Sequence, residues 1–281
     1  MHVIFGSSGV VGSAVLAELN RRGLPARGVY RSRKPGCHAG EVARVDLETG
    51  DGLDASLAGA TTVFLATGDM IDQVTAELRV VEAARRAGAR RLVKLSIMSA
   101  ESEAFFYARV HRAIERGVEA SGIAYTLLRP GGFMQNFIHY YGHAIRTEGV
   151  LRLPCDDFEE NVIDARDIAR VAAECLSSDR FEGEALTLCG PQPLSYASMV
   201  AEISAHTGRK VTFASISAEA FRATMLPYAV SQEHVDGITA MLRFHQEGRG
   251  TKTSDAVFEV TGARPRSFAA FAREHASSWL P

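Results

Sequence analysis

Residues 5–12 read FGSSGVVG, and they are the most informative segment for the architecture of the chain. It lies between a short apolar segment at 2–5 (HVIF) and a stretch with helical periodicity that extends to about Arg22. Glycines at positions 6, 9 and 12, between a strand and a helix, are typical of a turn that binds a dinucleotide. The first glycine allows a tight turn, the second lets the backbone approach a pyrophosphate, and the third lets helix and strand pack closely.

Strands and helices alternate through the first 130 residues. Strands are predicted at 2–5, 25–31, 41–46, 61–67, 91–96 and 123–130, and the two longest helices at about 70–87 and 102–120. Apolar strands separated by amphipathic helices predict a parallel sheet with helices on both faces. With right-handed crossovers this is an α/β doubly wound, or Rossmann, fold.

The alternation loosens after residue 130. Helices are predicted near 133–146, 164–176 and 195–208, a further strand at 185–190, and mostly helix in the remaining chain. We therefore expect a dinucleotide-binding domain over 1–150. A smaller, mostly helical C-terminal substrate lobe is expected over 151–281, with some return of the chain to the sheet.

Composition narrows the class of protein. The chain has 281 residues, 46% of them hydrophobic and 23% charged, with a formal net charge of −2. Such a chain can bury a full core, and it lacks the one-sided charge that would bind nucleic acid or an acidic membrane surface. We expect a cytoplasmic monomer or homodimer whose four cysteines are unpaired.

The end of the second strand predicts which dinucleotide is bound. An NAD enzyme usually has an acidic residue there, but this chain has YRSRK (30–34). A guanidinium can pair with a 2′-phosphate, so we predict NADP(H), with Arg31 as the main contact and Ser32 and Lys34 beside it. The alternative is a solvated basic loop.

Other cofactor contacts follow from the ends of the strands. Asp46 and Leu47 are expected near the adenine ring, and the residues after the fourth strand should line the cofactor channel. The full expected set in the turn and channel is Gly6, Ser7, Ser8, Gly9, Val10, Val11, Gly12, Ala66, Thr67 and Gly68.

These features together resemble a known family. The glycine turn, VFLAT (63–67), RLVKLS (91–96), EASGIAYTLLRPGGFMQN (119–136) and VIDARDIARVAA (162–173) closely resemble the NmrA-like branch of the atypical short-chain dehydrogenases, over essentially the whole chain. The resemblance implies an NADP-binding Rossmann domain with a small substrate lobe. That family contains NAD(P)H-dependent quinone, azo-dye, isoflavone and benzylic-ether reductases, and also regulators that bind the dinucleotide without turning it over.

The resemblance also implies positions for nicotinamide and substrate. Pro130, Gly131 and Phe133 would border the nicotinamide, although a strand often ends at a proline for structural reasons alone. An apolar, aromatic wall for the substrate is expected from Met98, Phe133, Asn136, Phe137, Tyr140 and Tyr141.

The catalytic candidates are His111, Tyr107 and Ser96. Tyr107 precedes His111 by four residues on one predicted helix, where a short-chain dehydrogenase would have Tyr and Lys. The structural alternatives are a helix histidine paired with Glu115, an aromatic wall residue and a serine that caps a strand end. Ser96 is also expected near the cofactor, and Ser99 is a second serine at this strand end.

Two further features concern buried charge and metal binding. Lys94 falls in a strand expected to be buried, so it needs a partner or a role. No metal is expected, because His139 and His143 lack a third ligand.

The favoured function is an NADPH-dependent reductase that transfers hydride to a conjugated, aromatic or quinone-like molecule. The alternatives are a non-catalytic NADP(H)-binding regulator or redox sensor, and a tailoring reductase of secondary metabolism.

Overall fold

The computed structural model describes residues 1–31 and 40–281. These form two compact units that are described separately. Unit 1 comprises Met1–Glu103, Ala108–Arg129 and Ile168–Thr187, and unit 2 comprises Ala104–Tyr107, Pro130–Asp167 and Leu188–Pro281. The division of roles expected at residue 150 stays a prediction.

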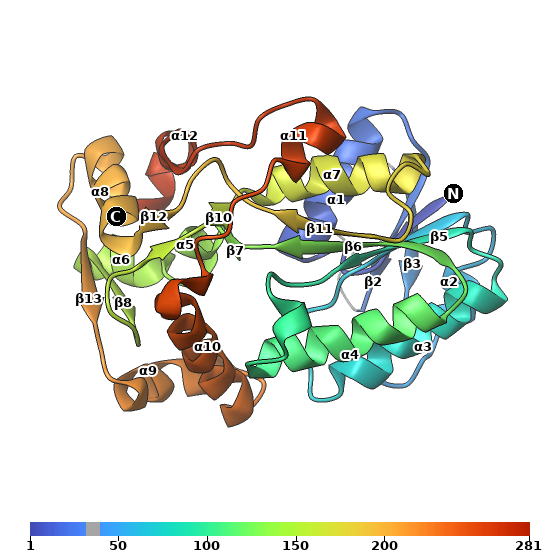
Figure 1. Cartoon of the computed structure of the whole chain (residues 1–281), viewed down its shortest axis with the longest axis horizontal. Helices are drawn as coiled ribbons and strands as arrows, with labels where there is room; N and C mark the ends of the chain where they lie inside the picture. Colours follow the sequence, from blue (N-terminus) through green and yellow to red (C-terminus); the bar gives the residue numbers. More distant parts are fainter. Residues whose placement is uncertain (32–39) are drawn as a thin grey trace. The chain divides into compact units, whose positions relative to one another are not determined.

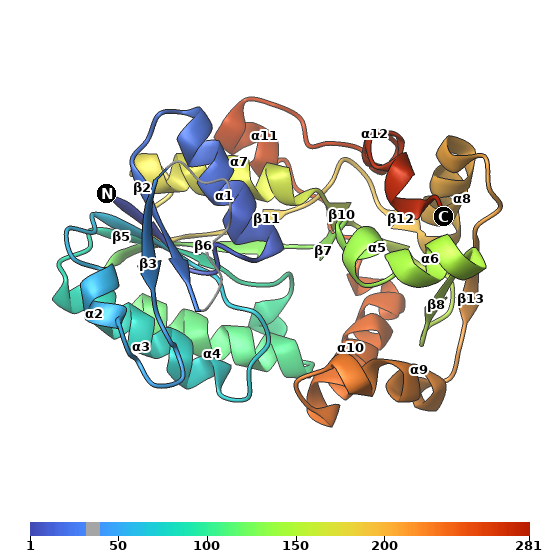
Figure 2. The same cartoon turned by 180° about the vertical axis from the view of Figure 1, so that it is seen from behind.

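A seven-stranded sheet is the framework of unit 1 (Figures 1 and 2). Its order is β11-β6-β5-β4-β1-β2-β3, and the pairings from β3 across to β6 are parallel. The strands are β1 (His2–Ile4), β2 (Ala26–Tyr30), β3 (Glu41–Arg44), β4 (Thr62–Leu65), β5 (Arg91–Leu95), β6 (Ala124–Pro130) and β11 (Glu184–Leu188). This confirms the predicted doubly wound, Rossmann-like fold. The order reverses beside β1, which is where ligands bind in open α/β sheets.

Helices cover both faces of this sheet. In both views, α1 (Val10–Arg21) and α7 (Ala165–Ser177) lie on one face, and α3 (Gln73–Arg86) and α4 (Phe106–Ala120) lie on the other. The sequence explains where α3 starts, because the Asp72 side chain accepts a hydrogen bond from the Thr75 N–H at 3.3 Å.

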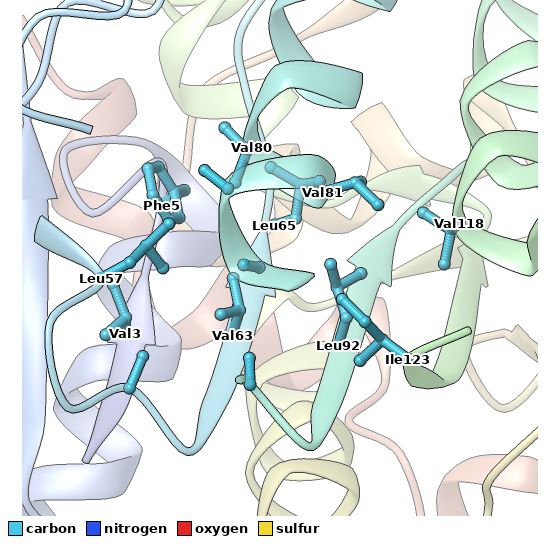
Figure 3. Close-up of a cluster of buried hydrophobic side chains, with 14 of the residues drawn as sticks. Val3, Phe5, Leu57, Val63, Leu65, Val80, Val81, Leu92, Val118 and Ile123 are labelled. Carbon is cyan, nitrogen blue, oxygen red and sulfur yellow. The ribbon is translucent and has the colours of Figure 1, made fainter. Parts of the chain in front are cut away.

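Strand side chains pack against α3 and α4 to form the core of unit 1 (Figure 3). Val63, Leu65 and Leu92 from β4 and β5 are fully buried. They lie in one cluster with Val80 from α3 and Val118 from α4. Burying one such side chain stabilises the fold by roughly 1.5–3 kcal/mol, which explains why these strands read as continuous apolar runs.

Unit 2 combines short strand pairs with helices. The pairs are β7 (Gly132–Phe133) with β10 (Val162–Ile163), β8 (Val150–Leu153) with β13 (Thr212–Ser215), and β9 (Glu159–Glu160) with β12 (Leu194–Ser195). The larger helices are α8 (Tyr196–Thr207), α9 (Ala218–Met225) and α10 (Gln232–Phe244), followed by α11 (Ala256–Thr261) and α12 (Phe268–Glu274). The helix predicted over 195–208 is α8; the Ser195 side chain caps it, and Gly208 ends it at φ 66°.

One predicted helix is broken in two. The segment expected as a helix over 133–146 forms α5 (Asn136–His139) and α6 (Gly142–Glu148). The Tyr140 and Tyr141 N–H groups both donate to the Asn136 carbonyl, which closes α5 after one turn.

The structure bears on the pairing of the cysteines and on whether a helix could span a membrane. Cys155, Cys175 and Cys189 are buried, free thiols, whereas Cys37 lies outside the described residues. Across the residues that the structure describes, no helix is long and apolar enough to cross a membrane.

Candidate functional site

The glycine turn in unit 1 has no room for side chains at two positions. Gly6 has φ 76°, and a Cβ atom there would lie 2.4 Å from the Ala66 carbonyl oxygen. A Cβ atom on Gly12 would lie 2.2 Å from the Gly6 carbonyl oxygen. Both positions therefore require glycine, and the turn brings the end of β1 directly against the start of α1 and the end of β4.

The N-terminus of α1 is suited to an anion. The helix begins after Gly9, has no acidic residue in its first turn, and lacks a side-chain cap among the residues that the structure describes. Ser8 and Gly9 are exposed, and Val10 is half-buried, whereas Val11 is buried. Free N–H groups and the helix dipole favour phosphate at such an end, so the residues present fit the pyrophosphate of a dinucleotide.

Ser7 has a structural function in this turn. Its hydroxyl donates to the Ile4 carbonyl at 2.6 Å and accepts from the Val29 N–H at 3.2 Å, and the residue is fully buried. The side chain thus ties the turn to β2, which leaves only its backbone to meet a ligand.

Arg31 follows β2 and points into solvent. Its side chain is 72% exposed, and the exposed Glu48 carboxylate lies 3.9 Å from its guanidinium. An ion pair this loose and exposed contributes little, so the guanidinium can turn to a 2′-phosphate. Ser32 and Lys34, which are predicted beside it, lie outside the described residues.

The loop after β3 is held by a contact that the sequence did not reveal. Asp46 Oδ1 accepts from the Glu48 N–H at 2.9 Å, which builds a turn that leaves Leu47 half-buried. Arg79 Nη1, from α3, donates to the Leu47 and Glu48 carbonyls at 2.6 and 2.9 Å. Asp46 therefore supports the shape of the loop expected near adenine, and Arg79 fixes its position.

Lys94 has the buried partner that the sequence could not name. Its Nζ lies 2.8 Å from Glu77 Oε2, and both side chains are completely buried. Glu77 Oε1 also accepts from Thr67 at 2.7 Å and from Gln73 at 3.0 Å. The amine further contacts the carbonyl of Leu95. This cluster joins the carboxyl ends of β4 and β5, next to buried Ala66 and exposed Gly68.

Ser96 belongs to a second buried network. Its hydroxyl donates to Glu115 Oε1 at 2.6 Å. The Glu115 carboxylate also accepts from Arg129 Nε at 2.9 Å, from Arg129 Nη2 at 2.7 Å and from Arg112 Nη1 at 3.0 Å. Burial acts to raise the pKa of Glu115, but the hydrogen bonds from Arg129 and Ser96 outweigh it and lower that pKa. In this arrangement the Ser96 proton is directed at Glu115, and its catalytic role stays a prediction.

His111 is not paired with Glu115, so that structural alternative is wrong. Its Nδ1 atom is buried and lacks a hydrogen-bond partner among the described residues. Burial and the charge of Lys94 hold the pKa of His111 well below its usual value. The ring is therefore neutral near pH 7 and can exchange a hydrogen bond with a ligand, but it is not a ready source of a proton.

Ser99, the second serine expected at this strand end, is the less satisfied of the two. Its backbone is left-handed, with φ 64°, a conformation unusual for any residue but glycine. Its hydroxyl is buried and has no hydrogen-bond partner within the described part of the chain. Backbone strain next to a strand end is common at functional sites.

Tyr107 is grouped with unit 2, whereas His111 is grouped with unit 1. The Tyr107 hydroxyl donates to the His234 carbonyl at 3.1 Å. Its ring also contacts Phe106, with ring centroids 5.2 Å apart. These contacts match the aromatic-wall alternative, and the catalytic role of Tyr107 stays a prediction.

The residues expected to border the nicotinamide or to face substrate differ in exposure. Pro130 and Gly131 are buried, and the Gly131 N–H donates to the Leu188 carbonyl at 3.0 Å, whereas Phe133 and Asn136 are half-buried. Met98 in unit 1 is also buried, at 1% exposure.

Phe137 lies in the core of unit 2, and its expected place against the substrate stays a prediction. It is 1% exposed and contacts the rings of Phe268, Tyr141 and Tyr196. Trp279 Nε1 donates to its carbonyl at 2.7 Å. The aromatic pattern of this segment did not distinguish an inward ring from a pocket wall.

The two tyrosines that follow differ. Tyr140 is 67% exposed, so its ring lies at the surface. Tyr141 packs edge-on against Phe137, and burial raises its pKa.

Two relatives of known activity match the whole chain. An NAD(P)H azoreductase from Xenophilus azovorans is 31% identical over 99% of both chains. A (4-alkanoyl-5-oxo-2,5-dihydrofuran-3-yl)methyl phosphate reductase from Streptomyces griseus is 31% identical over 100% of both. Both are reductases, which supports an oxidoreductase.

The solved structures agree on the fold. The NADPH complex of quinone oxidoreductase QOR2 from Escherichia coli superposes with a TM-score of 0.84 at 22% identity, covering 98% of this chain and 99% of that one. The model of the NmrA-like family matches residues 2–265. Together with the identity to the azoreductase, this match shows that the chain belongs to the NmrA-like family.

Proposed function

We propose that this protein is an NADPH-dependent reductase of conjugated, aromatic or quinone-like molecules. The observation that carries the proposal is the glycine turn, where Gly6 and Gly12 admit no side chain and the α1 N-terminus is open to an anion. The azoreductase relative, which uses NAD(P)H, supports the same cofactor class.

Arg31 is the basis for preferring NADPH to NADH. Its exposed guanidinium can make a charge-assisted hydrogen bond to a 2′-phosphate, a group that NADH lacks. The bound cofactor would supply the hydride, and the turn would hold its pyrophosphate through backbone N–H groups.

The available proton donors favour an acceptor that does not need a proton from an acidic side chain. The Ser96 and Tyr107 hydroxyls donate to Glu115 and to the His234 carbonyl, and His111 is neutral because of burial and Lys94. A quinone or azo acceptor can take its proton from water after hydride transfer, so it does not need a strongly acidic side chain. A simple ketone would need one.

The lack of a strongly acidic proton donor among Ser96, Tyr107 and His111 also favours a second candidate, a non-catalytic NADP(H)-binding regulator. Such a protein would need no free proton donor at all. Tailoring of a biosynthetic intermediate is the third possibility, and the Streptomyces relative, a reductase of a substituted dihydrofuranone phosphate, supports it.

Calorimetric titration with NADPH and with NADH tests the cofactor. We expect at least a roughly tenfold preference for NADPH, about 1.4 kcal/mol. Oxidation of NADPH is then followed at 340 nm, roughly its absorbance maximum, with 1,4-naphthoquinone, an azo dye or cyclohexanone as acceptor. Turnover of the first two and not the third supports the reductase. Tight NADPH binding without turnover of any acceptor supports the regulator, and binding of neither dinucleotide refutes both.

A further inference from the structure

Unit 2 contains a buried polar cluster that the proposed function does not use. Glu160, at the end of β9, is 5% exposed, and Asn161 follows it with no exposed surface. His245, which comes directly after α10, is 3% exposed. His245 Nδ1 lies 2.8 Å from Glu160 Oε1, and the Tyr196 hydroxyl lies 2.5 Å from Glu160 Oε2.

The charge on Glu160 determines that Nδ1 of the His245 ring carries a proton. Burial acts to raise the pKa of Glu160, but the hydrogen bonds from His245 and Tyr196 outweigh it and hold that pKa below its usual value. An ionised carboxylate only accepts hydrogen bonds, so Nδ1 of His245 must carry the proton. If the ring is neutral, Nε2 is then a hydrogen-bond acceptor.

Three buried polar atoms of this cluster have no partner among the described residues. They are His245 Nε2 and both side-chain atoms of Asn161, Oδ1 and Nδ2. An unpaired buried polar atom is costly, and native structures contain few of them. Two hydrogen bonds tie Asn161 to the His245 segment, from the Asn161 N–H to the Gly250 carbonyl (2.9 Å) and from the Gly250 N–H to the His245 carbonyl (3.2 Å).

The surroundings of the cluster are aromatic. The His245 ring lies 6.0 Å from the rings of Phe105 and Phe244, and Tyr196 stacks on Phe213 at 5.7 Å. A cavity of about 60 Å³ lies against Val162, which follows Asn161, and against Leu194, the β-partner of Glu160. The cavity is lined by these neighbours in the chain and in the sheet, and not by Glu160, Asn161 or His245 themselves.

We propose that Asn161 and the Glu160–His245 pair form a binding site for an aromatic ligand that carries a neutral hydroxyl group. The hydroxyl donates to His245 Nε2, and the Asn161 amide, which has both a donor and an acceptor, binds a ligand oxygen. Glu160 acts as a positioning residue that holds the His245 tautomer. An anionic ligand is disfavoured because the Glu160 carboxylate lies behind the ring. Taking this ligand as the hydride acceptor, or its reduced product, rests on the proposed reductase function, whereas the binding itself does not.

The first test compares two probes on the unaltered protein without NADPH. Calorimetric titration with 2-naphthol and with 2-methoxynaphthalene compares a free hydroxyl with its methyl ether. We expect 2-naphthol to bind at least roughly tenfold more tightly. Equal affinities, or no binding of 2-naphthol up to its solubility limit, would overturn the proposal.

The second test uses Asn161→Leu, for which a binding role and a structural role predict opposite signs. If the amide is kept for a ligand, Leu removes two unpaired polar atoms, so Tm of the free protein rises by about 2–4 °C while 2-naphthol binding weakens at least roughly tenfold. If ordered water satisfies the amide for structural reasons, Tm falls and 2-naphthol affinity is unchanged, which would refute the proposal.

Gln135→Leu is the matched control. The Gln135 amide donates to Asp164 at 3.0 Å and accepts from the Ala165 N–H at 3.0 Å, so its removal should lower Tm and leave 2-naphthol affinity unchanged. Failure of the proposed function is seen separately, as absence of NADPH binding in a protein that still binds 2-naphthol.

Discussion

Replacing Lys94 with methionine gives the sharpest test of how unit 1 is held together. The Lys94 amine and the Glu77 carboxylate are 2.8 Å apart and completely buried. Lys94→Met keeps most of the side-chain volume but leaves the carboxylate without its charged partner. Removing one member of a buried ion pair costs about 3–5 kcal/mol, because the remaining charge stays in a low-dielectric environment. The two neutral donors, Thr67 and Gln73, reduce this loss but do not neutralise the charge.

The double variant Lys94→Met/Glu77→Gln should recover most of the lost stability. The second substitution replaces the carboxylate with a neutral amide, whose oxygen can still accept from Thr67 and Gln73. We expect each single variant to lose about 3–5 kcal/mol of unfolding free energy and the double variant to lose less than either.

Urea unfolding of the four proteins, followed by circular dichroism, measures this cycle. A double variant that loses the sum of the two single losses would refute the ion pair.

Three further predictions concern other residues. Arg31→Ala should weaken NADPH at least roughly tenfold and leave NADH unchanged in calorimetric titration, and equal losses would show that Arg31 does not bind the 2′-phosphate. Folding lowers the pKa of His111, so as the pH falls below about 6.5 the unfolded chain binds a proton that the folded chain does not, and the free energy of unfolding decreases. Chemical unfolding of wild type and His111→Asn at about pH 7.5 and 5.5 measures this decrease. We expect it to be about 1.4 kcal/mol smaller in the variant than in wild type. Phe137→Ala should destabilise the protein by about 3–5 kcal/mol in urea unfolding, as expected for a core ring, and a change in KM with unaltered stability would return Phe137 to a substrate wall.

The sequence by itself determined the sheet and its turn. Every strand predicted through residue 130 is present within a few residues. Most are apolar runs bounded by glycine, proline or a charged helix end, whereas β3 reads EVAR and is largely exposed. Glycine at positions 6 and 12 was also predicted from the motif, although the close approach that excludes a side chain at Gly6 is to Ala66, a residue distant in the chain. The family was visible for the same reason, because its motifs are contiguous.

The partners of the buried polar groups could be identified only from the folded chain. Lys94 and Glu77 are 17 positions apart and Glu160 and His245 are 85 apart, and no periodicity predicts which side chain each carboxylate meets. The same limit applies to Phe137, because an aromatic residue in a core and one in a pocket wall have the same sequence pattern. Pairing and exposure of single side chains depend on how distant segments pack, and that information is spread over the whole chain.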